Sequence, residues 1–413
     1  MKFSELSEIA LSQDIFIAGT DTGIERDLLP KLPSICTHAL VIVGIRRCGK
    51  STLAQQFAEK TSRGYFYMNF EDIRLSSFEI ADFRLLDKLI RESKRKLLFF
   101  DEIQNAPKWE LYIRQKLNEK YHVVLTGSNA SMLSRELGTK LTGRHIEKEL
   151  FPFSYPEFLR WANKKPGVES FDEYLQSGGF PEWLKTGNMD IINNLQDDII
   201  YRDIAVRYKL RDAGSLRRLF SYLASNASQR TSPSKLISVC GVKSPTTVLE
   251  YLSYFESSYL IQIMPQFARS FKAQSVAPKK IYVSDLGLIW ASSISFSKNF
   301  GALLENFVFN HLRLQTKNLC YFSNSNSECD FIVNPNKNPL CIQVCYDMNL
   351  DNQDREINGV ISALEFFNSK EGYILTRNAR DEILKNGKSI YVLPAWEYFS
   401  NTHLSPPVQA LAL

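Results

Sequence analysis

The sequence lacks several features that would assign it to a specialised class of protein. No run of apolar residues reaches the roughly 18 to 20 residues that a membrane-spanning helix needs. The N-terminal stretch carries Glu5 and Glu8 where a signal peptide would have an apolar segment, so we expect no export. No internal repeat and no low-complexity segment is visible. These absences predict a cytoplasmic chain of folded domains without a membrane partner.

The seven cysteines also lack a spacing that would indicate a disulfide framework. Cys320, Cys329, Cys341 and Cys345, with His311 nearby, could be considered as a zinc site. No C-x₂-C pair occurs among them, however, and structural zinc sites usually contain one. We therefore expect reduced thiols on half-buried strands.

A strong charge of one sign is absent as well. The chain has 50 basic and 45 acidic residues, which gives a net charge of +5. This mild excess permits a nucleic-acid partner but does not require one. With 413 residues, of which 44% are hydrophobic, the chain is long enough for two or three folded domains.

What the sequence does contain is a complete phosphate-binding motif. Residues 44–52 read GIRRCGKST and satisfy G-x-x-x-x-G-K-[ST] in full. An apolar run at 38–43 precedes the motif and a helical pattern at 51–61 follows it, which is the context that a phosphate loop requires. Glycines permit the tight turn that directs backbone N–H groups and a helix N-terminus at phosphate oxygens. The residues expected around ATP are Gly44, Ile45, Arg46, Arg47, Cys48, Gly49, Lys50, Ser51 and Thr52.

Within this motif, Lys50 is expected to contact the β- and γ-phosphates, and Ser51 to ligate Mg²⁺. The apolar strand FFDEIQ at 99–104 supplies the next element, because it delivers Asp101 to the carboxyl edge of the sheet. There Asp101 can hold Mg²⁺, and Glu102 can orient and deprotonate the attacking water.

The stretch LTGSNASML at 125–133 places Ser128 and Asn129 beside the same sheet edge. Either side chain could contact the γ-phosphate or the attacking water. A simple cap at the start of a following helix explains the same residues equally well.

The pattern along the chain predicts an α/β protein with four regions. Alternating strands and helices over 1–150 predict a doubly wound parallel sheet of the P-loop NTPase type. Amphipathic helices over 151–210 predict a helical lid. A helix, glycine turn, helix and strand over 211–270 predict a winged helix, whose basic residues suit either DNA or a protein partner. The mixture of helical and strand patterns over 271–413 predicts a second α/β domain.

These residues, in this order, resemble the AAA+-type ATPases of the archaeal-ATPase-like clade that carry a nuclease-like C-terminal domain. The segments LTGRHIEKELFPFSYPEF at 141–158 and SGGFPEW at 177–183 extend the resemblance over nearly the whole chain. The resemblance implies a polar sensor residue at Ser128 or Asn129. It also implies that Arg144 senses the γ-phosphate or acts as an arginine finger, in cis or in trans within a dimer or ring. A surface ion pair is the alternative for Arg144.

For the last region, the resemblance implies a relative of the PD-(D/E)xK nucleases. Glu305 and Asp330 match the helix glutamate and the strand aspartate of such sites. Gln343 and Cys345 stand where the second glutamate and the lysine are expected. Glutamine is a poor magnesium ligand, and cysteine cannot supply an ammonium charge. We therefore expect a degenerate nuclease fold that is kept for binding or packing.

Two functions follow from these patterns. In the first, ATP binding and hydrolysis drive a molecular switch that moves the lid and the winged helix against DNA or a protein. In the second, ATP gates a C-terminal nuclease that processes nucleic acid. The substitutions at 343 and 345 favour the first function, and Glu102 argues against a scaffold that binds nucleotide without turnover.

Overall fold

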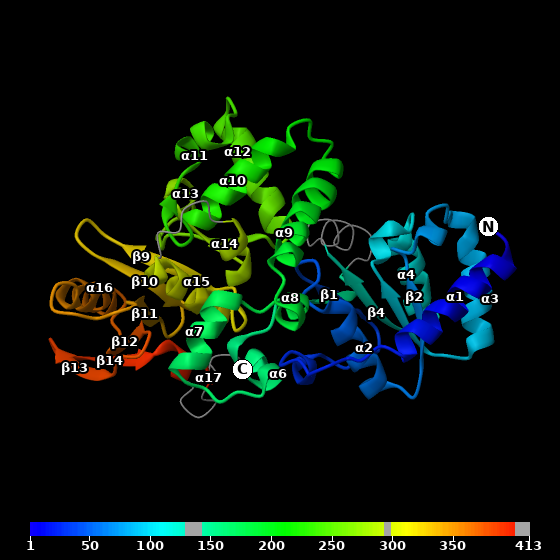
Figure 1. Cartoon of the computed structure of the whole chain (residues 1–413), viewed down its shortest axis with the longest axis horizontal. Helices are drawn as coiled ribbons and strands as arrows, with labels where there is room; N and C mark the ends of the chain where they lie inside the picture. The colour runs from blue at the N-terminus through cyan, green and yellow to red at the C-terminus, as the bar shows by residue number, and fades with distance from the viewer. Residues whose placement is uncertain (129–142, 293–298, 401–413) are drawn as a thin grey trace. The chain divides into compact units, whose positions relative to one another are not determined.

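The computed structural model describes residues 1–128, 143–292 and 299–400 (Figure 1). The chain divides into two compact units. The first unit comprises residues 1–151 together with 257–259, and the second comprises the rest. Across the three described ranges, no helix is both long enough and apolar enough to cross a bilayer.

The first unit is built on a five-stranded parallel sheet, with the strand order β2-β3-β4-β1-β5. All residues of β1 and β3 are buried, as their uninterrupted apolar runs predict for strands covered on both faces. The strands are β1 Ala39–Val43, β2 Tyr65–Asn69, β3 Leu97–Asp101, β4 His122–Gly127 and β5 His145–Glu149.

Helices connect these strands, because parallel neighbours require crossover connections. In α3 the buried residues Phe83, Leu86, Leu89 and Ile90 repeat at helical spacing. The helices are α1 Phe3–Ala18, α2 Lys50–Thr61, α3 Phe83–Ser93 and α4 Trp109–Asn118, with short 3₁₀ turns at Leu29–Lys31, Ile73–Leu75, Ile80–Asp82 and Ile103–Asn105. The parallel α/β sheet predicted for the N-terminal region is confirmed.

The second unit starts with a group of helices. Ser154 begins α6 with a capping box, since its hydroxyl accepts from the Glu157 N–H while the Glu157 carboxylate accepts from the Ser154 N–H. The helices are α6 Tyr155–Ala162, α7 Val168–Ser177, α8 Pro181–Thr186, α9 Met189–Asp197 and a π-helix, η5, Asp198–Val206.

Four further helices and a small sheet follow. The sheet order is β6-β8-β7, so the last strand lies between the other two. This element order is compatible with the predicted winged helix, but the sheet extends to Val283, beyond the expected boundary at residue 270. The elements are α10 Ala213–Ser225, β6 Arg230–Thr231, α11 Pro233–Cys240, α12 Pro245–Ser257, β7 Ile261–Met264, α13 Phe271–Val276 and β8 Lys279–Val283.

The C-terminal part contains a six-stranded mixed sheet in the order β13-β14-β12-β11-β10-β9. Strands β11, β12 and β14 are parallel, and the other pairs are antiparallel. Helix α16 packs on β10, β11 and β12. The elements are α14 Leu286–Ser292, α15 Phe300–Arg313, β9 Leu319–Ser323, β10 Glu328–Val333, β11 Leu340–Val344, α16 Gln353–Phe366, β12 Glu371–Thr376, β13 Asp381–Lys385, β14 Lys388–Pro394 and α17 Ala395–Ser400.

Candidate functional site

The glycine loop connects the carboxyl end of β1 to the N-terminus of α2. Gly44 packs so closely that a Cβ atom there would lie 2.0 Å from the carbonyl oxygen of Leu150. Gly49 has a φ of +99°, a conformation that side chains other than glycine rarely adopt, and it directly precedes α2. The loop therefore bends around a helix N-terminus, where unpaired N–H groups and the helix dipole attract an anion.

Lys50 is the first residue of α2 and is only 5% exposed. Its ammonium group donates a hydrogen bond to the carbonyl oxygen of Ile45, at 3.0 Å. The side chain thus folds back over the loop from which it emerges. A phosphate in the loop would offer the ammonium a charged acceptor, which forms a stronger hydrogen bond than a carbonyl does.

Two buried contacts hold the back of the loop. The thiol of Cys48 donates to the carbonyl oxygen of Leu150 at 3.4 Å, and burial raises the pKa of this thiol. Arg26, which is 4% exposed, donates to the carbonyl oxygens of Cys48 at 2.9 Å and of Phe151 at 2.7 Å. Cys48 therefore fills space, while Arg26 joins the loop to the segment that follows β5.

The other side chains of the loop differ in their surroundings. Ile45 is fully buried, and Thr52 is half-buried in the first turn of α2. Arg46 forms an ion pair with Glu71. Arg47 is exposed and has a φ of +61°. The structure thus gives the two adjacent arginines different environments, which the sequence motif alone does not distinguish.

Asp101 ends β3 and meets Ser51 at the same edge of the sheet. The Ser51 hydroxyl donates to Asp101 Oδ1 at 2.9 Å, and the Tyr67 hydroxyl donates to Oδ2 at 3.1 Å. Thr126, at the end of β4, donates a further hydrogen bond to Oδ1. Burial, and next the charge of Glu102, raise the pKa of Asp101, although these three hydrogen bonds oppose the shift. A hydroxyl and a carboxylate beside a phosphate loop fit the oxygen ligands that Mg²⁺ prefers.

Glu102 follows in a left-handed conformation, with a φ of 48°. Its backbone N–H donates to the Thr126 hydroxyl at 3.1 Å, which ties it to β4. Its carboxylate accepts hydrogen bonds from the Gln104 amide and, at 3.3 Å, from the Ser128 hydroxyl. The structure therefore brings Ser128 to Glu102, while Asn129 lies outside the described residues.

Arg144 lies away from these residues. It is exposed, precedes β5, and donates to Asn118 Oδ1 at 2.7 Å. Strand β5 runs parallel to β1, with His145 paired to Ala39 at the start of both strands. The phosphate loop follows the other end of β1, roughly 13 Å of strand away. The structure therefore does not bring Arg144 to the phosphate loop of its own chain.

The sequence analysis missed several residues of this site. Tyr67 and Thr126 hold Asp101, Gln104 holds Glu102, and Arg26 braces the loop. Thr126 lies near the carboxyl end of β4, two residues before the predicted Ser128. The sequence pattern could therefore have placed it at the sheet edge. Arg26 lies in no periodic segment, and no local signal could have identified it.

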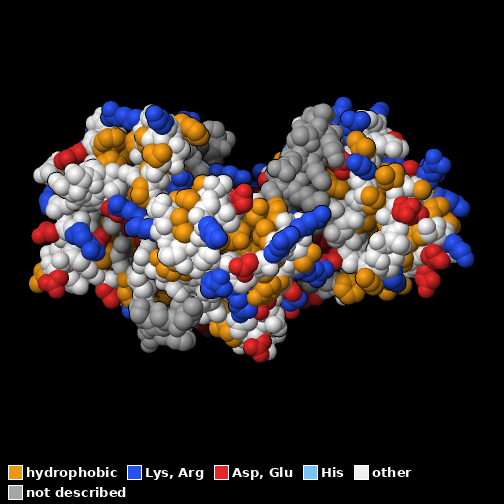
Figure 2. All heavy atoms as spheres, turned by 90° about the horizontal axis from the view of Figure 1, so that it is seen from above, with side chains coloured by type: hydrophobic (Ala, Val, Ile, Leu, Met, Phe, Trp, Pro, Cys, Tyr) orange, Lys and Arg blue, Asp and Glu red, His pale blue; other side chains and the backbone are white. Residues whose placement is uncertain are grey.

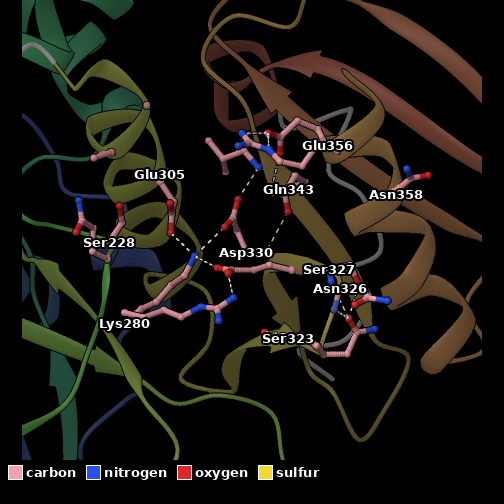
Figure 3. A pocket seen from close by; sticks show the side chains of 18 of the residues that line it. Ser228, Lys280, Glu305, Ser323, Asn326, Ser327, Asp330, Gln343, Glu356 and Asn358 are labelled. Carbon is pink, nitrogen blue, oxygen red and sulfur yellow. Dashed lines mark hydrogen bonds and ion pairs between the residues drawn. The ribbon is translucent and has the colours of Figure 1, made fainter. Parts of the chain in front are cut away.

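Three of the four C-terminal residues singled out by the nuclease-like pattern, Glu305, Asp330 and Gln343, line a pocket of about 840 Å³ (Figure 3). Glu305 comes from α15, Asp330 from β10 and Gln343 from β11. The Gln343 amide accepts from the Asp330 N–H at 3.1 Å and donates to the Glu356 carboxylate at 2.7 Å. Cys345 lies next to β11, and burial raises the pKa of its thiol to about 11.

The four C-terminal cysteines pack in a hydrophobic cluster with residues such as Ile332 and Val360. His311 is buried, and its Nε2 accepts from the Tyr155 N–H at 2.9 Å. Within the described ranges, no three His, Cys, Asp or Glu side chains converge in a way that could hold a metal ion. The cysteines belong to the core of the sheet and are buried, rather than half-buried as expected from the sequence.

Comparison with known families matches three successive segments of the chain. Residues 37–159 match the profile of an AAA domain. Residues 168–297 and 300–398 match two domains of unknown function, DUF8612 and DUF4143. The AAA match covers the phosphate loop, Asp101 and Glu102.

Two relatives align with most of the chain. An uncharacterized protein of Methanocaldococcus jannaschii is 33% identical over 385 residues, which cover 87% of this chain and 86% of that protein. An uncharacterized protein of Haemophilus influenzae is 30% identical over 329 residues, which cover 75% of this chain and 82% of that protein. The chain therefore belongs to the family of AAA-domain proteins that includes these two relatives.

Proposed function

We propose that the chain binds ATP with Mg²⁺ and hydrolyses it. The observation that carries this proposal is the hydrogen bond between the Ser51 hydroxyl and the Asp101 carboxylate, beside the ammonium of Lys50 in the loop. Mg²⁺ takes few protein ligands and completes its octahedron with water and phosphate oxygens. The AAA-domain match supports nucleotide binding by these residues.

Each residue has a distinct part in the proposed reaction. Lys50 would neutralise charge on the β- and γ-phosphates, while Ser51 and Asp101 would hold Mg²⁺, which would supply Lewis-acid stabilisation of the phosphate charge. Glu102 orients the attacking water and accepts its proton. Gln104 and Ser128 fix the Glu102 carboxylate in position, since both donate hydrogen bonds to it.

Two substitutions test this proposal. Lys50→Ala should weaken ATP binding by at least about tenfold, because it removes the charge in the loop. Glu102→Gln should leave ATP binding nearly unchanged and lower kcat by about 10²- to 10⁴-fold, because it removes the general base. Calorimetry measures binding, and phosphate release measures turnover.

Lys60→Ala is the matched control, since Lys60 lies in the last turn of the same helix and its ammonium forms an exposed ion pair with Glu25. It should behave like the parent protein. If Lys50→Ala binds and splits ATP as the parent does, the assignment of the phosphate site is wrong. If only Glu102→Gln retains full turnover, the assignment of the base is wrong.

We further propose that nucleotide binding drives a molecular switch. Leu150 and Phe151 contact the phosphate loop through Gly44, Cys48 and Arg26. Phe151 also packs edge-on against Tyr259, whose hydroxyl donates to Glu149 at 3.3 Å. A nucleotide that shifts the loop can therefore also shift Tyr259, through these packed side chains.

Tyr259 lies in the turn between α12 and β7, two elements of the proposed winged helix. Its φ of 60° is unusual for an aromatic residue, and its side chain is buried. A buried side chain couples the movements of its neighbours, because protein interiors are close-packed and leave little room for one group to shift alone. This connection supports the coupling of nucleotide state to the winged helix.

The proposed client of the switch is a macromolecule, DNA or protein. Lys243, in the turn before α12, and Thr246, in its first turn, are exposed and suit phosphate contacts. The same helix also exposes Leu249 and Glu250, which suit a protein surface better. On the face drawn in Figure 2, basic side chains are interspersed with acidic and apolar ones and form no continuous basic stripe.

We propose a role in trans for Arg144, within a dimer or ring of this chain. Its exposure and its place at the sheet edge opposite the loop support this role better than one in cis. We also propose that the C-terminal region has no nuclease activity of the expected type. Gln343 is held by Glu356, and Cys345 brings no positive charge to the position of the missing lysine.

A further inference from the structure

Arg26 places its guanidinium group between two backbone carbonyl groups at the phosphate loop. One terminal nitrogen, Nη1, donates to the carbonyl oxygen of Cys48 at 2.9 Å, and the other, Nη2, donates to that of Phe151 at 2.7 Å. The residue is only 4% exposed. A Cβ atom added to Gly49 would lie 3.3 Å from Nη1. The guanidinium therefore packs directly against the peptide that joins Cys48 to Gly49.

The backbone around Arg26 is held by contacts that involve no residue of the loop. The side-chain amide of Gln56, on α2, donates to the carbonyl oxygens of Thr22 at 3.0 Å and Ile24 at 2.8 Å. The Arg26 carbonyl oxygen accepts from the Leu29 N–H at 2.9 Å. The guanidinium thus extends from a fixed segment, and its planar fork presents the donors in one rigid geometry. Arg26 can therefore impose an orientation on the groups that it contacts.

The contact with Cys48 determines where the next backbone N–H group points. The Cys48–Gly49 peptide is trans, and in a planar trans peptide the C=O and N–H bonds point in opposite directions. Because the Cys48 carbonyl group faces Arg26, the Gly49 N–H faces away from Arg26. This N–H lies at the start of α2, where the first N–H groups of a helix lack intrahelical partners and can bind an anion.

Glycine at position 49 does not select this orientation by itself. Its φ is +99°. A half-turn of the Cys48–Gly49 peptide would bring this angle to roughly −80°, and glycine adopts positive and negative φ about equally well. The half-turn would direct the Cys48 carbonyl oxygen to the side on which the Gly49 N–H now lies, and a carbonyl oxygen repels phosphate. The charge-assisted hydrogen bond from Arg26 favours the observed orientation, because it is stronger than a bond between neutral groups.

The charge of Arg26 also acts on the interior of the loop. Burial raises the pKa of the Cys48 thiol, whereas the positive charges of Lys50 and next of Arg26 oppose this rise. Both cations therefore influence the same buried point in the loop. Charges that are shielded from water interact more strongly than exposed ones, so an anion in the loop is attracted by Arg26 as well as by Lys50.

We propose that Arg26 is a positioning residue of the phosphate site, which holds the Cys48–Gly49 peptide so that the Gly49 N–H is directed at the phosphates. This role rests on the proposed binding of ATP, and it adds to that site a residue outside the glycine motif. The same guanidinium holds the carbonyl group of Phe151, whose ring packs against Tyr259. Arg26 therefore also connects the orientation of this loop peptide to the proposed switch.

Nuclear magnetic resonance of the parent protein labelled with ¹⁵N-glycine tests the direction of the N–H group. The Gly49 signal is identified by its loss in Gly49→Ala. A non-hydrolysable ATP analogue with Mg²⁺ should move the Gly49 proton downfield, because a phosphate oxygen is a charged acceptor. The signal of Gly64, which precedes β2, should move much less. If the analogue binds and the Gly49 proton moves no more than that of Gly64, the proposal is overturned.

Substitutions at Arg26 test whether the guanidinium sets this orientation. Arg26→Met should weaken ATP binding by at least about tenfold and reduce the downfield movement of the Gly49 proton. Arg26→Lys keeps the charge but has no planar fork for two carbonyl groups, so it should weaken ATP binding by at least about threefold. Calorimetry measures the affinities, and thermal unfolding identifies the variants that remain folded. Parent affinity in either folded variant would overturn the proposed role.

Arg74→Met is the matched control, because Arg74 lies in the same compact unit and its exposed guanidinium pairs with Asp72. It should bind ATP like the parent, and an equal loss in this variant would show that the effect is not specific to Arg26. If neither Arg26 variant folds, the glycine spectrum of the parent protein decides. A parent protein that binds no ATP would overturn the proposed function and this role together. A parent that binds ATP with an unmoved Gly49 proton would overturn this role alone.

Discussion

At the scale of single residues, the conformation of the phosphate loop depends on the absence of a side chain at Gly44. A side chain at this position would collide with the Leu150 carbonyl oxygen, which is part of the backbone and cannot rotate away. The same carbonyl accepts from the Cys48 thiol, so a shift at Leu150 would disturb the loop twice. The loop geometry is thus set by packing against the segment after β5 as well as by its own sequence.

Gly44→Ala should therefore weaken ATP binding by at least about tenfold, without any loss of a polar contact to the nucleotide. Calorimetric titration measures the affinity, and thermal unfolding shows whether the domain remains folded. Gly167→Ala is the control, because a Cβ there meets no atom within 4 Å. An unchanged affinity of Gly44→Ala for ATP would show that the segment at Leu150 can move to make room for the added methyl group.

At the scale of elements, the turn between α7 and α8 is held by a buried carboxylate. Asp285 accepts hydrogen bonds from the backbone N–H groups of Gly179 and Gly287, both at 2.7 Å. Gly178 has a φ of +70°, and a Cβ at Gly179 would lie 2.1 Å from the Phe153 carbonyl oxygen. The SGGF sequence thus serves close backbone packing around Asp285, which the sequence pattern showed only as a turn.

This carboxylate predicts a pH-dependent stability. Burial raises the pKa of Asp285 from 3.8 to about 7, against the opposing backbone hydrogen bonds. At pH values between 3.8 and about 7, Asp285 holds a proton in the folded chain but has released it in the unfolded chain. The resulting stabilisation is fully present below about pH 4 and is lost as the pH rises through 7. Its size is at most about 4 kcal/mol.

Urea unfolding of the parent protein and of Asp285→Asn from pH 4 to pH 8 measures this effect. Asparagine does not ionise, so the difference in unfolding free energy between the two proteins should change across this range, with the parent losing more stability at high pH. All other titrating groups are shared and cancel in the difference. Parallel pH profiles would show that the hydrogen bonds keep Asp285 ionised throughout.

At the scale of the whole molecule, the proposed switch links nucleotide state to a client through Tyr259. If the client is DNA, ATP should change the affinity of the parent protein for duplex DNA, and that affinity should fall as salt rises. Tyr259→Ala should remove the effect of ATP on DNA affinity and leave hydrolysis within about twofold of the parent, since Tyr259 does not touch the phosphate loop. Fluorescence anisotropy at several salt concentrations measures both proteins.

Tyr222→Ala is a control, because Tyr222 is a partly exposed tyrosine on α10 of the same proposed winged helix. It should preserve the response to ATP. A negligible DNA affinity at every salt concentration, with or without ATP, would indicate a protein client instead. A response to ATP that survives in Tyr259→Ala would exclude this residue as the link.

The sequence predicted those features that depend on residues close together in the chain. The loop at 44–52 and the acids after β3 follow from local motifs, and the parallel sheet follows from alternating patterns. Contacts between distant residues could not be predicted in this way. Arg26 reaches Phe151, and Lys280 reaches Asp330, across 125 and 50 positions that no periodicity connects.

Arg144 shows a different limit. The motif around it suggested a role near the phosphates, but the register of β5 against β1 places it at the other edge of the sheet. The sequence pattern did not identify the strand His145–Glu149, so it could not show that Arg144 precedes the amino end of a strand parallel to β1. Position 345 shows a related limit: the resemblance implied a lysine there, whereas the lysine that contacts Asp330 comes from β8, in a different part of the sequence.

The position of Lys280 has a consequence for the evolution of the two matched segments that it joins. The lysine lies in the segment that matches DUF8612, whereas its three acidic partners, Glu305, Glu328 and Asp330, lie in the segment that matches DUF4143. A chimaera that joined one segment to a foreign neighbour would leave buried acids without their base, or a buried base without its acids, at a cost of several kcal/mol. Relatives that lose the lysine should therefore also lose an acid, and the two segments should descend together.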